Sequence, residues 1–240
     1  GHRLAELRGG VEERGMHGVE AFDTSLLKGQ ILINLDSNEE TIFTVGCAGG
    51  PAVRTEIPIA RDEMKSDATS LQIKISGLMG GHSGEDIHLG RANSIKLMAR
   101  LLLRIEREVG MQLLDLGGGL KYNAIPREAN AVIAVSDSSQ KKVETILTDF
   151  TAVLRNEYRN SDPDISITME PAKTIENARP MSSLSVRSIL NYILFAENGV
   201  TYMDMEFKDT VESSVSLGVA RTEQDKAVFQ TLTRSSLSSR

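Results

Sequence analysis

The alternation of two hydrophobic periods between positions 71 and 169 restricts the fold of this chain more than any other feature. Leu71, Ile73 and Ile75 alternate with polar residues, which predicts a strand with one buried face. At 91–107 and 139–158 apolar residues recur every three to four positions, which predicts two amphipathic helices. Further strands are predicted at 111–116, 128–135 and 165–169. This order predicts an α+β fold, with helices on one face of a mainly antiparallel sheet.

The segments on either side of this region add further elements. We expect Gly117, Gly118 and Gly119 to end the strand at 111–116, since glycine weakens strands. The remaining predicted elements are a helix at 182–195 and strands at 31–35, 42–45, 211–219 and 227–234. Pro51 follows two glycines, which is a turn signal. We therefore predict a domain boundary there, with a first segment 1–51 and a domain 52–240.

Composition excludes several classes of protein. The 240 residues include 27 Lys and Arg and 33 Asp and Glu, a formal net charge of -6, which argues against broad binding to nucleic acid or anionic membranes. No run approaches the length of a membrane span. The single cysteine, Cys47, excludes an internal disulfide and a cysteine-based zinc finger. We therefore expect a cytoplasmic setting.

Acidic residues near the N-terminus are the first candidates for chemistry. Glu12 and Glu13 are either solvated charges or a functional pair, in which one ligates a metal and its neighbour is the general base on a bound water. Asp36 follows an apolar strand, where ligands often bind. It is either a turn residue or a metal ligand, and its oxygens suit zinc, manganese or magnesium.

Two glycine-rich loops hold the other candidates. His82 lies among the glycines of 77–84, where its imidazole could stabilise an oxyanion or remain an ordinary surface group. The six-residue offset between His82 and His88 is not a helical spacing for a metal pair. Asn123 follows the three glycines at 117–119, and its amide could bind a substrate carbonyl or carboxylate, or merely form a turn.

Taken together and in this order, these stretches resemble one family. The chain resembles the aminoacyl-histidine dipeptidase (cytosolic non-specific dipeptidase) family of co-catalytic zinc peptidases over nearly its whole length after residue 11. The stretches that carry the resemblance are 12–16, 33–37, 46–50, 80–84, 123–129, 198–200 and 214–219. It implies a lid or dimerisation-like domain at 52–240 and a partial α/β catalytic segment at 1–51.

The resemblance also implies a reaction and a metal site. The reaction is hydrolysis of dipeptides, of the Xaa-His type or of broad specificity, by water bound between two zinc ions, with manganese or cobalt as alternatives. Glu12 matches the family's general base, which activates this water. Glu13 matches a ligand of one metal and Asp36 a ligand of the other. Glutamate alone is too weak a base to deprotonate water at neutral pH, so the base needs the metals.

Three further residues match positions of the family that face the substrate. His82 matches the lid histidine that stabilises the tetrahedral intermediate, and Asn123 matches a lid residue that contacts substrate. Arg234 lies where the lid carries an arginine near the substrate carboxylate. The resemblance also implies that the complete protein forms a homodimer.

The departures from the family pattern are equally specific. The His-x-Asp segment that precedes the paired glutamates and the late histidine ligand are not found here. Val11 stands where the family usually has Asp, and Tyr122 where it often has Arg. We therefore expect this chain to be a fragment that cannot assemble the dinuclear site alone. The alternatives are a catalytically inactive dimerisation or interaction module and, more distantly, a small-ligand-binding domain that uses the glycine loops.

Overall fold

The computed structural model describes residues 46–172 and 179–239, together with the single positions 23, 25, 28, 29, 31 and 41. The chain divides into two units, Gly1–Gly46 and Cys47–Arg240. The second unit contains every strand and α-helix that the structure describes. The strands predicted at 31–35 and 42–45 lie almost entirely outside the described residues, and the boundary between 51 and 52 stays a prediction.

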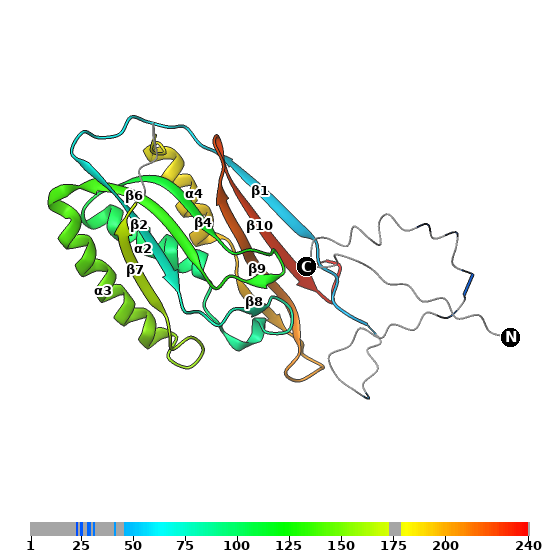
Figure 1. The fold of residues 1–240 in the computed structure, drawn as a ribbon. Coiled ribbons are helices and arrows are strands. Elements are labelled where there is room, and N and C mark those ends of the chain that lie inside the picture. Colours follow the sequence, from blue (N-terminus) through cyan, green and yellow to red (C-terminus); the bar gives the residue numbers. More distant parts are fainter. Residues whose placement is uncertain are drawn as a thin grey trace. The chain divides into compact units, whose positions relative to one another are not determined.

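One antiparallel sheet of eight strands forms the first layer of the second unit (Figure 1). Its strands run in the order β1-β10-β9-β4-β6-β2-β7, and β8 pairs with the part of β9 that β4 leaves free. Every pairing is antiparallel. The strands are β1 (Ala52–Pro58), β2 (Ala68–Ser76), β4 (Gln112–Gly118), β6 (Ala129–Ser136), β7 (Ser166–Pro171), β8 (Gly199–Met203), β9 (Val211–Thr222) and β10 (Lys226–Ser235).

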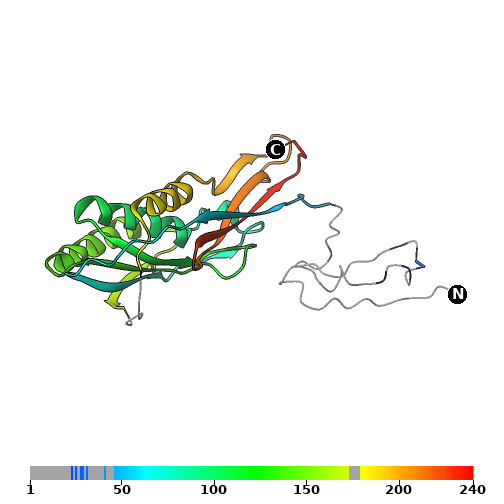
Figure 2. The same ribbon diagram turned by 90° about the horizontal axis from the view of Figure 1, so that it is seen from above.

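Three helices form the second layer, and all of them cover the same face of the sheet (Figure 2). They are α2 (Ser94–Glu108), α3 (Gln140–Glu157) and α4 (Ser183–Phe195). This confirms the predicted α+β fold with helices on one face of an antiparallel sheet. Among the helices of the described ranges, none combines the length and the apolar character that crossing a membrane requires.

The core lies beneath α2, which packs between α3 and α4. Ile95, Leu102 and Ile105 recur at helical spacing and are fully buried (0% exposed). They pack in one cluster with the strand residues Ile73 and Ile133. Each buried aliphatic side chain of this size contributes about 1.5–3 kcal/mol. The helical spacing of apolar residues at 91–107 therefore arises from the packing of α2 against the sheet.

Two parts of the sheet differ from the sequence prediction. Strand β4 does not end at its glycines but includes Gly117 and Gly118. A β-carbon at Gly118 would lie 2.8 Å from the Ile95 side chain, so glycine allows α2 to approach the strand closely. Strands β1 and β8 were not predicted, because most of their residues are exposed at sheet edges and show no alternation of apolar residues.

Candidate functional site

The loop between β2 and α2 brings two of the predicted site residues together. Its short strand β3 (Gly81–His82) pairs with β5 (Ala124–Ile125), with His82 opposite Ala124. The Ser83 N–H donates a hydrogen bond to the backbone oxygen of Asn123 (3.0 Å). His82 on β3 and Asn123 directly before β5, 41 positions apart in the sequence, therefore lie next to each other.

The imidazole of His82 is held in one orientation by its own loop. Its Nδ1 accepts hydrogen bonds from the backbone N–H groups of Glu85 (3.2 Å) and Gly84 (3.4 Å). A neutral imidazole has one donor and one acceptor nitrogen, so the proton resides on Nε2. The ring can therefore donate a hydrogen bond from Nε2 to an oxygen that enters the site.

Arg234 of β10 reaches the same place beside Gly84. A β-carbon at Gly84 would lie 3.0 Å from Arg234 Nε and 3.2 Å from His82 Cε1. The two side chains thus meet the same small volume, which only a glycine leaves open. All three residues predicted to face substrate, His82, Asn123 and Arg234, come together within the described residues.

Several polar atoms in this region are buried without a hydrogen-bond partner. Among the described residues these include Ser83 Oγ, Asn123 Oδ1 and Arg234 Nε, and Ser216 Oγ on the neighbouring strand β9. Ser83 is only 2% exposed. Leaving a buried polar atom unpaired costs about 1–3 kcal/mol, so such a cluster indicates a ligand site more than a structural core. We call His82, Ser83, Asn123 and Arg234 the His82–Arg234 site.

The other predicted site residues are not placed by the structure. Glu12, Glu13 and Asp36 lie outside the described residues, so their roles stay predictions. Within the described ranges, no group of three or more His, Cys, Asp or Glu side chains could hold a metal ion. The pairing of His82 with His88 therefore finds no third ligand in that part of the chain.

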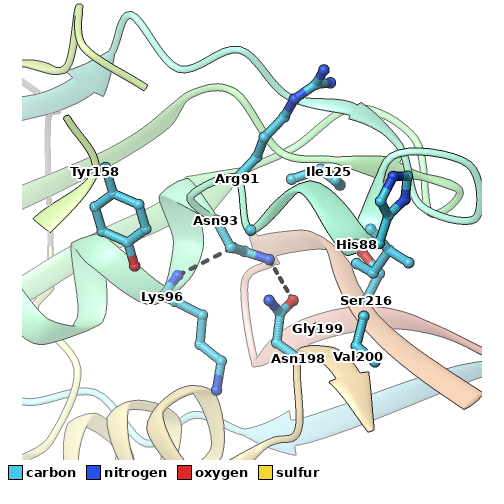
Figure 3. A pocket seen from close by; sticks show the side chains of 12 residues that line it. His88, Arg91, Asn93, Lys96, Ile125, Tyr158, Asn198, Gly199, Val200 and Ser216 are labelled. Atoms are coloured by element: carbon cyan, nitrogen blue, oxygen red, sulfur yellow. Dashed lines mark hydrogen bonds between the residues drawn. The ribbon is translucent and has the colours of Figure 1, made fainter. Parts of the chain in front are cut away.

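A pocket of about 490 Å³ opens beside the N-terminus of α2 (Figure 3). It is lined by residues of the 87–93 segment, of α2, of the strands β5, β8 and β9 and of the end of α3, among them His88, Arg91, Lys96, Tyr158 and Ser216. None of His82, Asn123 and Arg234 lines it. The pocket therefore does not contain these three side chains, although Ser216 lines it.

The polar side chains of this pocket bind one another. Asn93 caps α2 through Oδ1, which accepts from the N–H groups of Ile95 (3.0 Å) and Lys96 (3.2 Å). Its Nδ2 donates to Asn198 Oδ1 (2.8 Å) and to the Leu217 oxygen (2.9 Å), as the dashed line in Figure 3 marks for Asn198. Asn198, one of the residues that carry the family resemblance, thus joins α2 to β9.

Burial and packing also account for the contacts and pKa shifts of two titratable groups of the pocket, Lys96 and Tyr158. Lys96 Nζ donates to the backbone oxygens of Ile193 (2.6 Å) and Leu194 (3.2 Å) at the end of α4. Burial lowers the pKa of the Lys96 ammonium. Burial is also the main cause that raises the pKa of Tyr158. These residues tie helices together and leave few polar groups free to bind a ligand.

Sequence reasoning missed some residues that shape the site. Ser216 and Ser83 carry no distinctive pattern, because a buried unpaired hydroxyl is visible only in three dimensions. Asp162, which is fully buried, lies in a polar turn after α3 that suggests only a surface loop. Gly84 was noted as part of a glycine-rich loop, but its contact with Arg234 links positions 150 residues apart.

Comparison with known proteins shows what the chain is similar to. Residues 73–162 match the M20 peptidase dimerisation domain. The match begins within β2 and ends after α3, so it covers α2, the centre of the sheet and the loop that carries His82. The second half of the sheet, with α4, lies beyond the match.

Two individual proteins match almost the whole chain. The chain is 30% identical over 229 residues to the cytosol non-specific dipeptidase of Escherichia coli, a match that covers 95% of this chain and 47% of that protein. The crystal structure of aminoacylhistidine dipeptidase from Vibrio alginolyticus matches with 35% identity and a TM-score of 0.82, covering 95% of this chain and 46% of that one. These matches confirm the resemblance found in the sequence. The chain spans about half the length of the relatives it matches.

Proposed function

We propose that this chain supplies the substrate-facing lid of a metal-dependent dipeptidase and that Arg234 binds the carboxylate of a dipeptide. One observation carries the proposal: the buried Nε of Arg234 has no hydrogen-bond partner among the described residues. A guanidinium is always charged and binds carboxylates through two parallel hydrogen bonds. An anionic ligand is therefore the partner that this position lacks.

His82 and Asn123 complete the proposed contacts. With its Nδ1 engaged by the loop, His82 donates from Nε2 to the oxygen of the scissile carbonyl, which becomes negative during hydrolysis. Asn123 offers a buried amide oxygen without a partner, which suits an N–H donor of the substrate. A purely structural dimerisation module has no need for these unpaired groups, which argues against that alternative.

The proposed metal site draws on Glu12, Glu13 and Asp36, with Glu12 as general base. Carboxylate oxygens suit zinc, and also manganese or cobalt, so the donor set fits the expected metals. When bound, two such ions would supply an activated water and polarise the carbonyl. The described residues provide only the substrate contacts, so a complete site needs ligands in addition to these three carboxylates.

We also propose that the complete protein is a cytoplasmic homodimer. The support is the dimerisation-domain match and the similarity to the cytosol non-specific dipeptidase of Escherichia coli. Strand β4, inside the match, is paired on both sides within this chain, by β6 and β9. A second copy would therefore bind elsewhere, and sedimentation of the complete protein at several concentrations tests this.

Binding of a dipeptide and of its amide tests the role of Arg234. We expect the purified chain to bind alanyl-histidine at least about tenfold more tightly than alanyl-histidinamide in calorimetry, because a charged hydrogen bond is worth about 1.5–3 kcal/mol. Arg234→Met should abolish this difference, whereas Arg54→Met, at an exposed arginine of β1, should keep it. Equal binding of the two ligands by the unmodified chain would contradict the proposal.

Hydrolysis tests the role of Glu12. With zinc or manganese added, we expect little or no dipeptide hydrolysis by this chain alone, because its site is incomplete. In a complete protein, Glu12→Gln should abolish hydrolysis and leave dipeptide binding intact. Hydrolysis that is insensitive to Glu12→Gln would show that another residue is the base.

A further inference from the structure

Asp162 is a fully buried carboxylate (0% exposed) that the proposed contacts do not use. It lies in the turn after α3, where its backbone N–H donates to the Tyr158 oxygen (2.8 Å). Its side chain accepts two hydrogen bonds from distant backbone amides. Oδ1 accepts from the N–H of Met79 (2.8 Å), and Oδ2 accepts from the N–H of Ala92 (2.8 Å).

These two amides are the ends of the segment that carries His82. We call residues 79–92 the His82 loop. Because both ends bind one carboxylate, the loop is closed at a single point, although its ends are 13 positions apart. The only ladder within it is the two-residue pairing of β3 with β5. Such a short ladder holds a loop weakly, so the closure at its base is a principal constraint on its shape.

The charge of Asp162 is compensated where it lies. A buried carboxylate needs hydrogen bonds to replace its lost hydration, and two amides supply them. Ala92 directly precedes Asn93, the cap of α2, so the carboxylate also faces the positive N-terminal end of a 15-residue helix. Both oxygens of the Asp162 side chain therefore serve as hydrogen-bond acceptors at this position.

A second set of contacts carries this constraint to His82. The His82 N–H donates to Asp86 Oδ2 (2.8 Å), and the same oxygen lies 3.4 Å from Arg91 Nη1. Arg91 also donates to the Gly80 oxygen (2.5 Å) and directly precedes Ala92. The loop is thus braced inside by Arg91 and Asp86 and closed outside by Asp162.

We propose that Asp162 is a positioning residue, which holds the His82 loop so that the imidazole stays opposite Arg234. Without the closure, the two ends of the loop separate and His82 moves relative to β10. The role in catalysis rests on the proposed function of His82. The arrangement itself is testable without any substrate.

The test uses Asp162→Asn, which keeps the size of the side chain but leaves only one acceptor oxygen. Asp164→Asn is the matched control, because Asp164 is exposed and two positions further along the chain. Nuclear magnetic resonance measures amide exchange and the proton–proton contact between the His82 ring and the Arg234 side chain. We expect Asp162→Asn to speed exchange at Met79, His82 and Ala92 at least about tenfold and to weaken the ring contact, while core amides of α2 keep their protection.

Other outcomes overturn the proposal. Unchanged loop exchange and an unchanged ring contact in Asp162→Asn would show that the carboxylate does not hold the loop. Faster exchange across the whole domain would make Asp162 a residue of the fold only. If Asp162→Asn does not fold, amide exchange in the unmodified chain tests the closure instead. One carboxylate closes both ends, so the amides of Met79 and Ala92 should both be protected from exchange, and unprotected exchange at either would contradict the closure.

A binding measurement separates this proposal from the proposed function. If the unmodified chain binds alanyl-histidine, Asp162→Asn should weaken binding about tenfold, and Asp164→Asn should not change it. An unchanged affinity in Asp162→Asn would refute the positioning role. If the unmodified chain does not bind the dipeptide, the proposed function fails, whereas the exchange data still decide whether Asp162 holds the loop.

Discussion

The core beneath α2 and the His82–Arg234 site use the same chain in opposite ways. In the core, apolar side chains such as Leu102 and Ile133 are fully buried and meet other apolar groups. In the site, Ser83, Asn123 and Arg234 have buried polar atoms that no described residue satisfies. The core therefore gains stability from every contact, whereas the site gives up stability to keep polar groups available for a ligand.

The largest effect is expected from shortening a core side chain. Leu102→Ala removes a fully buried side chain from the middle of α2 and leaves a cavity. We expect the free energy of unfolding to fall by about 2–5 kcal/mol, measured by urea denaturation. The exposed Leu184→Ala on α4 is the control and should change stability by less than about 0.5 kcal/mol. A loss of stability as small as that of Leu184→Ala would show that Leu102 is not part of the packed core.

The second prediction is that removing a charge from the His82–Arg234 site does not lower the unfolding free energy, in contrast to the core. Arg234→Met keeps the aliphatic part of the side chain and removes a charge whose Nε is buried and unpaired. Because that charge is poorly compensated, we expect the unfolding free energy to stay unchanged or to rise by about 1 kcal/mol. Thermal unfolding of the two proteins measures this. A clear loss of stability would show that Arg234 supports the fold, and the contrast with the core would fail.

The contrast also explains which parts of the molecule could be predicted from sequence. Burial of α2 against β2 imposes a repeat, so Ile95, Leu102 and Ile73 reveal their elements by spacing alone. Strand β1 bears mostly exposed residues and leaves no such repeat. Sequence therefore predicts the layers of the fold well and the edges of the sheet poorly.

Site residues follow a different rule. The approach of His82 to Arg234 joins segments 152 positions apart, and only the family resemblance suggested that both face substrate. Asp162 could not be predicted, because its partners are backbone amides 83 and 70 positions away, which any residue type can offer. Contacts made by the main chain leave no trace in the side-chain pattern.

The third prediction separates ligand binding from stability. Gly84→Ala places a β-carbon 3.0 Å from Arg234 Nε and 3.2 Å from His82 Cε1, so both flexible side chains must shift by a few tenths of an ångström. We expect less than about 1 kcal/mol of lost stability. In calorimetry, the affinity for alanyl-histidine should fall by about 1 kcal/mol or more. Gly49→Ala, where no atom lies within 4 Å, is the control, and an equal effect of both changes would refute the role of Gly84.

The smallest effect is expected at the surface, where α2 and α3 are joined by an ion pair. Arg100 donates two hydrogen bonds of 2.8 Å to the carboxylate of Glu157. These bonds are the main cause that lowers the pKa of Glu157 below its ordinary value of 4.5. Both side chains are about one third exposed, so solvent screens the pair and Glu157→Gln should cost at most about 1 kcal/mol at pH 7.

The pH dependence of this loss of stability tests whether the charge of Glu157 causes it. A carboxyl group whose pKa is lower in the folded than in the unfolded state stabilises the fold above its unfolded pKa, and this contribution disappears as the pH falls through the folded pKa. We therefore expect the melting temperatures of the chain and of Glu157→Gln to differ by a constant amount above about pH 5 and to converge below pH 4.5. Glu144→Gln, on the exposed face of α3, should show no such convergence. A difference that persists at low pH would mean that packing of the Glu157 side chain, and not its charge, joins the two helices. Side-chain packing would then stabilise this surface contact as it stabilises the core.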